Sequence, residues 1–329
     1  MKKINSFSLY ITSALLSFNV SIAAETDLLI IESYHAEYPW DASYVNGISK
    51  NFEGSEYKVH RFQMDTKRIP KSDYQKKADE AWQFYQSIKP KLVFLGDDNA
   101  LKFLADKFAT TDTPVVYLGI NSNPRRMKLS KNITGVLERP LFKKSVVEIK
   151  KIMPKAKQIL VLFDSGNTSM HAVEEAFKGK TSLKISGLKV ELKQIGKKDL
   201  WESTIHSAKN DGFDAIIIGL YHTLIDNDNK SVNAETLIKW TSQNTPVPLF
   251  AFWSFTVGTD KAIGGMVLEG YSQGEKAAGI AKRILKGDNP TDIRPVIGEK
   301  GKFLFSKALL DKWKLTLPPD IADKTEYID

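Results

Sequence analysis

The sequence predicts an α/β fold of two similar Rossmann-like lobes, each with a parallel sheet, joined by a hinge. Short apolar runs alternate with amphipathic stretches along the chain of 329 residues, and this order indicates the strands and helices of parallel α/β sheets. The series also occurs twice. One set covers residues 27–118, and a second begins after residues 133–136 and a predicted helix that ends at Pro154. We therefore expect two lobes of the same kind.

The predicted strands are short and apolar throughout, as strands buried on both faces are. They cover residues 28–31, 92–95, 115–118, 159–163, 215–218 and 249–252. Helices are predicted at residues 72–86, 141–152, 169–177 and 275–285, and from residue 100 onward. Ligands of open parallel sheets bind beyond the carboxyl ends of the strands. Two facing lobes would therefore form a ligand cleft that the hinge can close.

The first 24 residues predict export. Lys2 and Lys3 precede an apolar run at residues 9–16 and a small-residue end at residues 21–24, which is the pattern of a cleaved secretory signal peptide. The run is shorter than the roughly 20 apolar residues of a membrane span; an uncleaved anchor is the alternative. No second long apolar segment and no cysteine for a lipid anchor follow. We therefore expect a free periplasmic protein that docks on a membrane partner.

Charge and motifs exclude several classes of function. The 47 Lys and Arg outnumber the 39 Asp and Glu, for a formal charge of +8, but they are spread along the chain. This favours solvated helix faces over a nucleic-acid surface. The five histidines lack metal-ligand spacing, and no phosphate-binding or dinucleotide glycine motif occurs. We therefore expect no nucleic-acid partner, no cofactor and no metal, and a monomeric protein.

Aromatic side chains gather after the first predicted strand, in residues 33–41. Tyr34, His35 and Trp40 offer ring faces for stacking and polar atoms for hydrogen bonds, which suits contact with a ligand. Packing of this loop on its own lobe is the alternative. The second lobe has counterparts after its own strands, for which a core position is equally open: Tyr221, His222 and Trp253.

Polar residues follow other predicted strands. Of Asp97 and Asp98, one is expected to cap the next helix and the other to bind an ammonium or hydroxyl group of a ligand; we choose Asp97 for the ligand. Asn121 follows the next strand, where it would orient a polar ligand or form a turn. Residues 164–169 begin a helix of the second lobe. Their backbone N–H groups would hold a carboxylate, or the segment only caps that helix.

Residues 270–274 match G-x-S-x-G, the nucleophile elbow of serine hydrolases. In that fold the acid and then the His follow the Ser in sequence, whereas the last His of this chain is His222. A hydroxyl without a positioned base is a poor nucleophile. We therefore expect no enzyme. A hydrolase that uses Ser272 is the least favoured alternative, and the structural interpretation is a closely packed helix start.

Four stretches resemble a known family. Residues 33–40 contain Ser-Tyr-His and Tyr-Pro-Trp, similar to the opening of its receptor-associated branch, and residues 133–136 resemble its crossover into the second lobe. Residues 148–163 resemble its helix, proline and strand, and residues 274–296 its final helix and ending. On these stretches nearly the whole mature chain resembles the type I periplasmic substrate-binding proteins of the ABC-transporter substrate-binding family.

The resemblance implies a solute-binding protein that captures a small polar ligand, such as an amino acid or a sugar, in an interlobe cleft. Hinge closure would present the ligand to an inner-membrane ABC permease or to a sensor kinase or cyclase, and the aromatic opening favours the sensor. It also implies lobe limits. The first lobe would hold residues 25–135 and about 266–300, and the second residues 136–265 and about 301–329.

Overall fold

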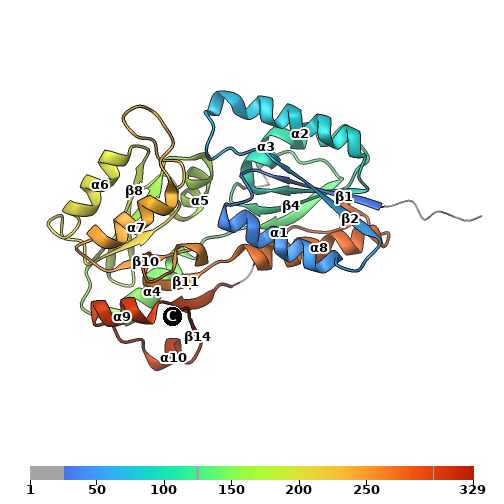
Figure 1. The fold of residues 1–329 in the computed structure, drawn as a ribbon. Helices are drawn as coiled ribbons and strands as arrows, with labels where there is room; N and C mark the ends of the chain where they lie inside the picture. The colour runs from blue at the N-terminus through green and yellow to red at the C-terminus, as the bar shows by residue number, and fades with distance from the viewer. Residues whose placement is uncertain (1–25, 124–125, 299) are drawn as a thin grey trace, which may run out of the picture.

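The computed structural model describes residues 26–123, 126–298 and 300–329. The predicted signal peptide, residues 1–24, lies outside them. Figure 1 shows two α/β lobes side by side, with a small sheet and two short helices from the end of the chain below one of them. The predicted α/β fold with parallel sheets is therefore confirmed.

The first lobe is built on a six-stranded parallel sheet with strand order β12-β5-β4-β3-β1-β2. Its strands are β1 (Thr26–Glu32), β2 (Tyr57–Gln63), β3 (Leu92–Gly96), β4 (Val115–Ile120), β5 (Ile133–Leu137) and β12 (Val296–Ile297). The central strands β3 and β4 are buried at every residue. Their continuous apolar sequence follows from this burial on both faces.

Helices cover both faces of this sheet. On one face lie α1 (Pro39–Phe52) and α8 (Gly270–Leu285), and on the other α2 (Tyr74–Ile88) and α3 (Asp97–Phe108). Short 3-10 turns, at Lys71–Asp73 and Pro290–Asp292, precede α2 and follow α8. The end of the sequence thus completes the first lobe, because α8 packs along α1 although the two are far apart in the chain.

The second lobe has a five-stranded sheet with order β10-β9-β6-β8-β7, in which only β7 is antiparallel to its neighbour. Its strands are β6 (Gln158–Asp164), β7 (Ser182–Ile185), β8 (Leu188–Ile195), β9 (Ala215–Ile218) and β10 (Leu249–Ala251). Its helices are α4 (Phe142–Ile152) and α5 (Asn167–Phe177) on one face, and α6 (Lys198–Ser207) and α7 (Ala234–Asn244) on the other.

A third, smaller sheet follows the second lobe. It consists of β11 (Gly264–Val267), β13 (Lys302–Phe305) and β14 (Thr325–Tyr327), with α9 (Lys307–Trp313) and α10 (Pro319–Ala322) beside it. A 3-10 turn at Ser254–Thr256 precedes β11. The chain therefore crosses between the lobes three times: between β5 and α4, between β11 and α8, and between β12 and β13.

The G-x-S-x-G segment lies where α8 packs on α1. A Cβ atom on Gly270 or Gly274 would collide with the backbone of α1, and one on Gly47 with the backbone of α8. The Ser272 hydroxyl donates to the carbonyl of Glu269 within the first turn of α8, at 3.2 Å. These glycines allow the two helix backbones to approach closely. The segment is therefore a closely packed helix start, as the structural interpretation of the motif predicted.

Candidate ligand-binding site

The two lobes touch each other along the carboxyl ends of their strands. The hydroxyl groups of Tyr34, from the β1–α1 loop, and Thr168, in the first turn of α5, share a hydrogen bond of 2.7 Å. The ring of Tyr38 meets the ring of His222, after β9, edge to face with centroids 4.8 Å apart. The lobes are therefore closed on each other around the aromatic loop that the sequence singled out.

Beneath this contact lies a pair of buried carboxyl groups, Asp41 and Asp97, which we call the acidic pair. Both residues are at most 2% exposed. Asp41 accepts a hydrogen bond from the backbone N–H of Tyr34 at 3.2 Å, but its Oδ1 atom and Oδ2 of Asp97 have no partner among the described residues. Burial raises the pKa of both groups, and the charge of Asp41 raises that of Asp97 further. The pair thus favours sharing one proton.

The backbone is shaped to hold Asp97 in place. Asp97 has φ of 67°, in the left-handed region that residues other than glycine rarely adopt. Opposite it, Gly119 has φ of 69°, and a Cβ atom there would lie 3.0 Å from Oδ1 of Asp97 and 3.3 Å from Nε1 of Trp40. Backbone strain of this kind, about 1–3 kcal/mol per residue, concentrates at functional sites.

The prediction that Asp97 or Asp98 caps the next helix is wrong. The helix begins at Asp97 rather than at residue 100, and its N-cap, Gly96, has no side-chain hydrogen bond. Because both acids lie inside the first turn, neither can occupy the capping position. The carboxylate of Asp98 instead accepts the backbone N–H groups of Asn121 and Ser122, at 3.2 and 2.8 Å, and so fixes the end of β4.

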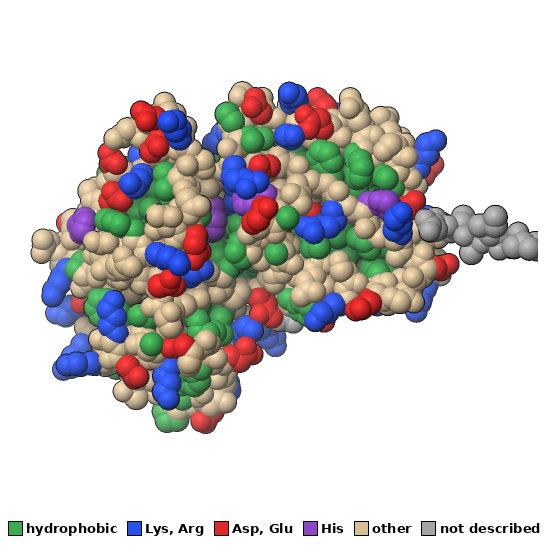
Figure 2. Space-filling model, in the orientation of Figure 1, with side chains coloured by type: hydrophobic (Ala, Val, Ile, Leu, Met, Phe, Trp, Pro, Cys, Tyr) green, Lys and Arg blue, Asp and Glu red, His purple; other side chains and the backbone are tan. Residues whose placement is uncertain are grey.

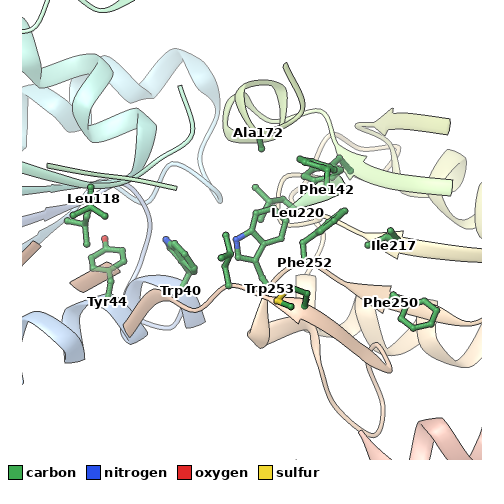
Figure 3. Packing of buried hydrophobic residues seen from close by; sticks show 14 of the residues in the cluster. Trp40, Tyr44, Leu118, Phe142, Ala172, Ile217, Leu220, Phe250, Phe252 and Trp253 are labelled. Carbon is green, nitrogen blue, oxygen red and sulfur yellow. The ribbon is translucent and has the colours of Figure 1, made fainter. Parts of the chain in front are cut away.

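Glu138, between β5 and α4, joins the two lobes. Its Oε1 atom accepts the indole N–H of Trp253 at 2.5 Å, and its Oε2 atom accepts the amide of Asn121 at 2.9 Å. Burial raises the pKa of Glu138 to about 8, although both donors act in the opposite direction. In Figure 3, Trp40 and Trp253 lie at the boundary between the lobes, on opposite sides of it. A titratable group therefore sits at a chain crossing, bonded to both lobes.

Lys67 is the buried cation of this region, at 6% exposure. Its ammonium nitrogen lies 4.1 Å from the ring centroid of Tyr34 and 4.6 Å from that of Tyr38. Burial lowers the pKa of Lys67, while the charge of Asp164 and then that of Asp97 raise it. A lysine held against two aromatic faces is stabilised by cation–π attraction.

A pocket of about 520 Å³ opens beside the aromatic contact, lined by residues of both lobes. Three of the predicted site residues line it: His35, Tyr221 and His222. The imidazole of His35 lies 3.2 Å from Oδ1 of Asp65. Burial lowers the pKa of His222 well below its usual value, so this imidazole is neutral. Figure 2 shows histidines at the hollow between the lobes.

The structure places the eight predicted site residues in two groups. The interior group lies around the acidic pair and Glu138: Tyr34, Trp40, Asp97, Asn121 and Trp253. The other three line the outer pocket. Ligand contact by these residues stays a prediction. Sequence reasoning missed further residues of the same region: Tyr38, Asp41, Lys67, Glu138 and Thr168. Tyr38 and Asp41 belong to the aromatic loop already noted and Thr168 to the helix start at residues 164–169, whereas no pattern marked Lys67 and Glu138.

A closed pair of α/β lobes with a polar interior between them is the architecture of a solute-binding protein. A family model described as ABC transporter substrate binding protein matches residues 42–327. The chain therefore belongs to the ABC transporter substrate-binding protein family. Its members are extracellular or periplasmic proteins that bind small molecules and associate with ABC transporters.

Three solved structures show the same fold at low sequence identity. An ABC domain from Streptococcus pneumoniae in complex with L-Trp is 20% identical, with a TM-score of 0.69 over 93% of this chain and 100% of that one. A conserved domain protein from Vibrio cholerae is 17% identical, with a TM-score of 0.68 and the same coverage. A ligand-free, open substrate-binding protein from Clostridium difficile is 18% identical, with a TM-score of 0.63 over 92% and 99%.

A comparison with curated protein sequences gives no significant match. Among residues 26–123, 126–298 and 300–329, no helix combines the length and apolar character that a membrane crossing requires. In the same part of the chain, His, Asp and Glu side chains do not gather into a group of three that could hold a metal ion.

Proposed function

We propose that this chain is a periplasmic solute receptor, exported by a cleaved signal peptide, that binds a small ligand with a positively charged nitrogen between its lobes. The acidic pair carries the proposal. Two buried carboxyl groups, in which Oδ1 of Asp41 and Oδ2 of Asp97 accept no hydrogen bond from the other described residues, are costly to keep ionised together, and the charge of Lys67 acts on them without a direct ion pair. A ligand ammonium group would supply both the charge and the missing hydrogen-bond donors.

The surroundings of the acidic pair suit a cation. The ring of Trp40 lies beside it, with an indole N–H that has no partner among the described residues, and Tyr34 lies above it, bonded through its backbone N–H to Asp41. Aromatic faces attract cations that have lost their water. The similar structure from Streptococcus pneumoniae was solved with L-Trp, a molecule that carries an ammonium group.

Closure would follow from a shift of population between open and closed lobes. The contact of Tyr34 with Thr168 joins residues of different lobes, so it exists only when the lobes are closed. A ligand that touches both lobes favours that state. We propose the three chain crossings as the hinge, which moves the lobe limits given above by one or a few residues, to the ends of β5 and β11.

The closed form would be recognised by a membrane partner, either an ABC permease or a sensor kinase or cyclase. We favour the sensor, because the aromatic opening is similar to that of the receptor-associated branch. Deleting the gene separates the two partners. Loss of uptake of the labelled ligand supports a permease, whereas unchanged uptake with loss of the cellular response to the ligand supports a sensor.

A solute screen tests the proposed function directly. Thermal-shift measurements with amino acids, polyamines, nucleosides and sugars should give a rise in melting temperature for solutes that carry a cationic nitrogen. Calorimetry with such a solute should show at least a tenfold loss of affinity for Asp97→Asn. Asp106→Asn, an exposed acid on the same helix, is the matched control and should bind as the wild type does.

Two results would overturn the proposal. One is a wild type stabilised only by neutral or anionic solutes, because the acidic pair would then have no role in binding. The other is equal affinity in Asp97→Asn and Asp106→Asn. Small-angle scattering completes the test, since a solute that closes the lobes must reduce the radius of gyration of an open population.

A further inference from the structure

The charge of Lys67 acts on both members of the acidic pair, but Lys67 makes no direct ion pair with either of them. Its side chain is buried, yet its ammonium group makes no hydrogen bond or ion pair with any of the described residues; its recorded contacts are the ring faces of Tyr34 and Tyr38. The acids that act on it electrostatically, such as Asp164 and Asp97, lie beyond ion-pair distance. A buried cation without an acceptor is costly, so an anion is expected to reach it.

Lys67 faces a groove of about 670 Å³ between the lobes, which we call the basic groove. Cationic side chains of both lobes line it: Lys67, Arg68, Lys71, Lys197 and Lys230. Within the part of the chain that the structure describes, its lining includes no Asp or Glu. Figure 2 shows the surface hollowed between the lobes, with Lys and Arg side chains on both rims. The groove therefore attracts negative charge.

The outer cations of the groove already have partners. Arg68 donates to Oδ1 of Asp65 at 2.7 Å, Lys197 donates to Oδ1 of Asn229 at 2.8 Å, and Lys230 lies 4.0 Å from Asp228. Such exposed pairs are solvated and contribute little. Lys67 differs from them in being buried and without an acceptor, so the specificity of the groove must rest on it.

The start of α5 adds hydrogen-bond donors beside Lys67. Ser165 and Gly166 line the groove, and the N-cap of this 11-residue helix, Gly166, provides no side-chain cap. The N-terminus of a helix carries a partial positive charge. Here the carboxylate of Asp164 already accepts the N–H of Gly166 and the hydroxyl of Ser169, so attraction of a further anion depends on the charge of Lys67. The hydroxyl group of Thr223, also in the lining, is buried and has no partner among the described residues.

We propose that the inner end of the basic groove, at Lys67 and the first turn of α5, is an anion-binding subsite that takes a carboxylate or phosphate group of the ligand. The inference rests on the proposed function and narrows it. The ligand is then dipolar, with its positively charged nitrogen at the acidic pair and its anionic group at Lys67. Lys67 selects such a ligand over a simple amine.

Small anions test this subsite without knowledge of the ligand. Melting temperatures are measured in increasing inorganic phosphate and, separately, acetate, against sodium chloride at equal ionic strength. The wild type should show a saturable rise of several degrees with at least one anion, and Lys67→Met should show none. Lys102→Met, which removes an exposed lysine on α3, should keep the full rise. Phosphate alone would indicate a phosphate ester as ligand, and acetate alone a carboxylate.

The variants also report on folding. Methionine keeps the length of the side chain but removes a charge that acts on buried acids such as Asp164 and Asp97, so the anion effect in Lys67→Met is measured as the rise above this variant's own melting temperature in chloride. Lys67→Arg keeps the charge and should retain part of the anion effect. The same rise in Lys67→Met and wild type would assign it to the exposed lysines and overturn the proposal, as would no rise in the wild type.

The outcome is separate from that of the proposed function. A specific anion effect with no response to cationic solutes would leave the subsite standing and remove the role of the acidic pair. A response to cationic solutes with no anion effect would support the role of the acidic pair and remove the anion subsite.

Discussion

Each lobe ends a central strand in an aspartate, and the two aspartates are used in opposite ways. Asp97 directly follows β3 of the first lobe, and Asp164 is the last residue of β6 in the second. They are equally buried, at 2% and 1% exposure. Asp164 accepts from the N–H of Gly166 and the hydroxyl of Ser169 on Oδ1, and from the N–H of Thr223 on Oδ2. Asp97 leaves an oxygen atom unpartnered on a strained backbone.

The difference separates a buried carboxylate whose hydrogen bonds are satisfied from one whose hydrogen bonds are not. Buried polar groups are normally satisfied, and an exception requires a physical reason. Asp164 stabilises the strand end of the second lobe by tying three donors together. Asp97, after a different strand of the first sheet, has no such donors, while its charge faces that of Asp41. The proposed ligand contact of Asp97 rests on this contrast.

The largest expected effect concerns folding. Asp164→Ala should lower the free energy of unfolding by about 4 kcal/mol, because hydrogen bonds to a charged group contribute about 1.5–3 kcal/mol each and the two backbone donors would remain buried. Asp97→Ala removes a poorly solvated charge but keeps the left-handed backbone, in which alanine is no more favourable than aspartate, so the two effects oppose each other and the free energy of unfolding should change by less than about 1 kcal/mol. Urea unfolding followed by circular dichroism measures both.

The comparison would fail if Asp97→Ala lost as much stability as Asp164→Ala. Asp97 would then be a structural group as Asp164 is, and the acidic pair would need no ligand. Asp106→Ala on the same helix corrects for any change in helix propensity.

The second prediction concerns pH. Glu138 holds its proton in the folded state up to a pKa of about 8, against 4.5 in a free side chain. Between these values the folded state binds more protons than the unfolded one, so stability falls as pH rises from about 5 to 8. One group can contribute a slope of up to about 1.4 kcal/mol per pH unit. In Glu138→Gln this slope should shrink by that amount, as melting temperatures across the range would show.

Glu56→Gln, at an exposed position, is the control and should follow the wild-type pH profile. An identical slope in wild type and Glu138→Gln would mean that Glu138 is ionised in the folded protein. Other buried acids share the direction of the effect, so the difference between variant and wild type is the quantity to compare.

The sequence predicted the central strands because burial on both faces leaves a continuous apolar run. All six predicted strands occur, among them the fully buried β3 and β4. The edge strand β2 was missed because its residues are partly exposed and its apolar and polar side chains are mixed. The pair β7 and β8 was missed for the same reason, since their burial also changes from residue to residue. The burial of the strands, rather than their intrinsic strand propensity, therefore made the fold predictable from the sequence.

The site was only partly predictable for a different reason. Strand ends can be located from a sequence, and this placed Tyr34, Asp97 and Trp253 in the same region. Lys67 and Glu138 lie in connections without periodicity, and their importance comes from burial and from neighbours distant in the chain. Whether an aspartate at a strand end is satisfied, as Asp164 is, depends on donors that only the tertiary structure supplies.

The smallest expected effect lies at the direct contact between the lobes. Removing the hydrogen bond between Tyr34 and Thr168 with Tyr34→Phe should weaken ligand binding about fivefold, since a neutral hydrogen bond contributes about 1 kcal/mol. The folding stability of each lobe should not change, because the bond joins the lobes and belongs to neither. Thr168→Val should have the same effect, and the double variant should be no weaker than either single one. If the losses of binding affinity in the two single variants added up in the double variant, the two hydroxyl groups would act independently and closure would not depend on their bond. Tyr34 would then affect binding only through contacts within the first lobe.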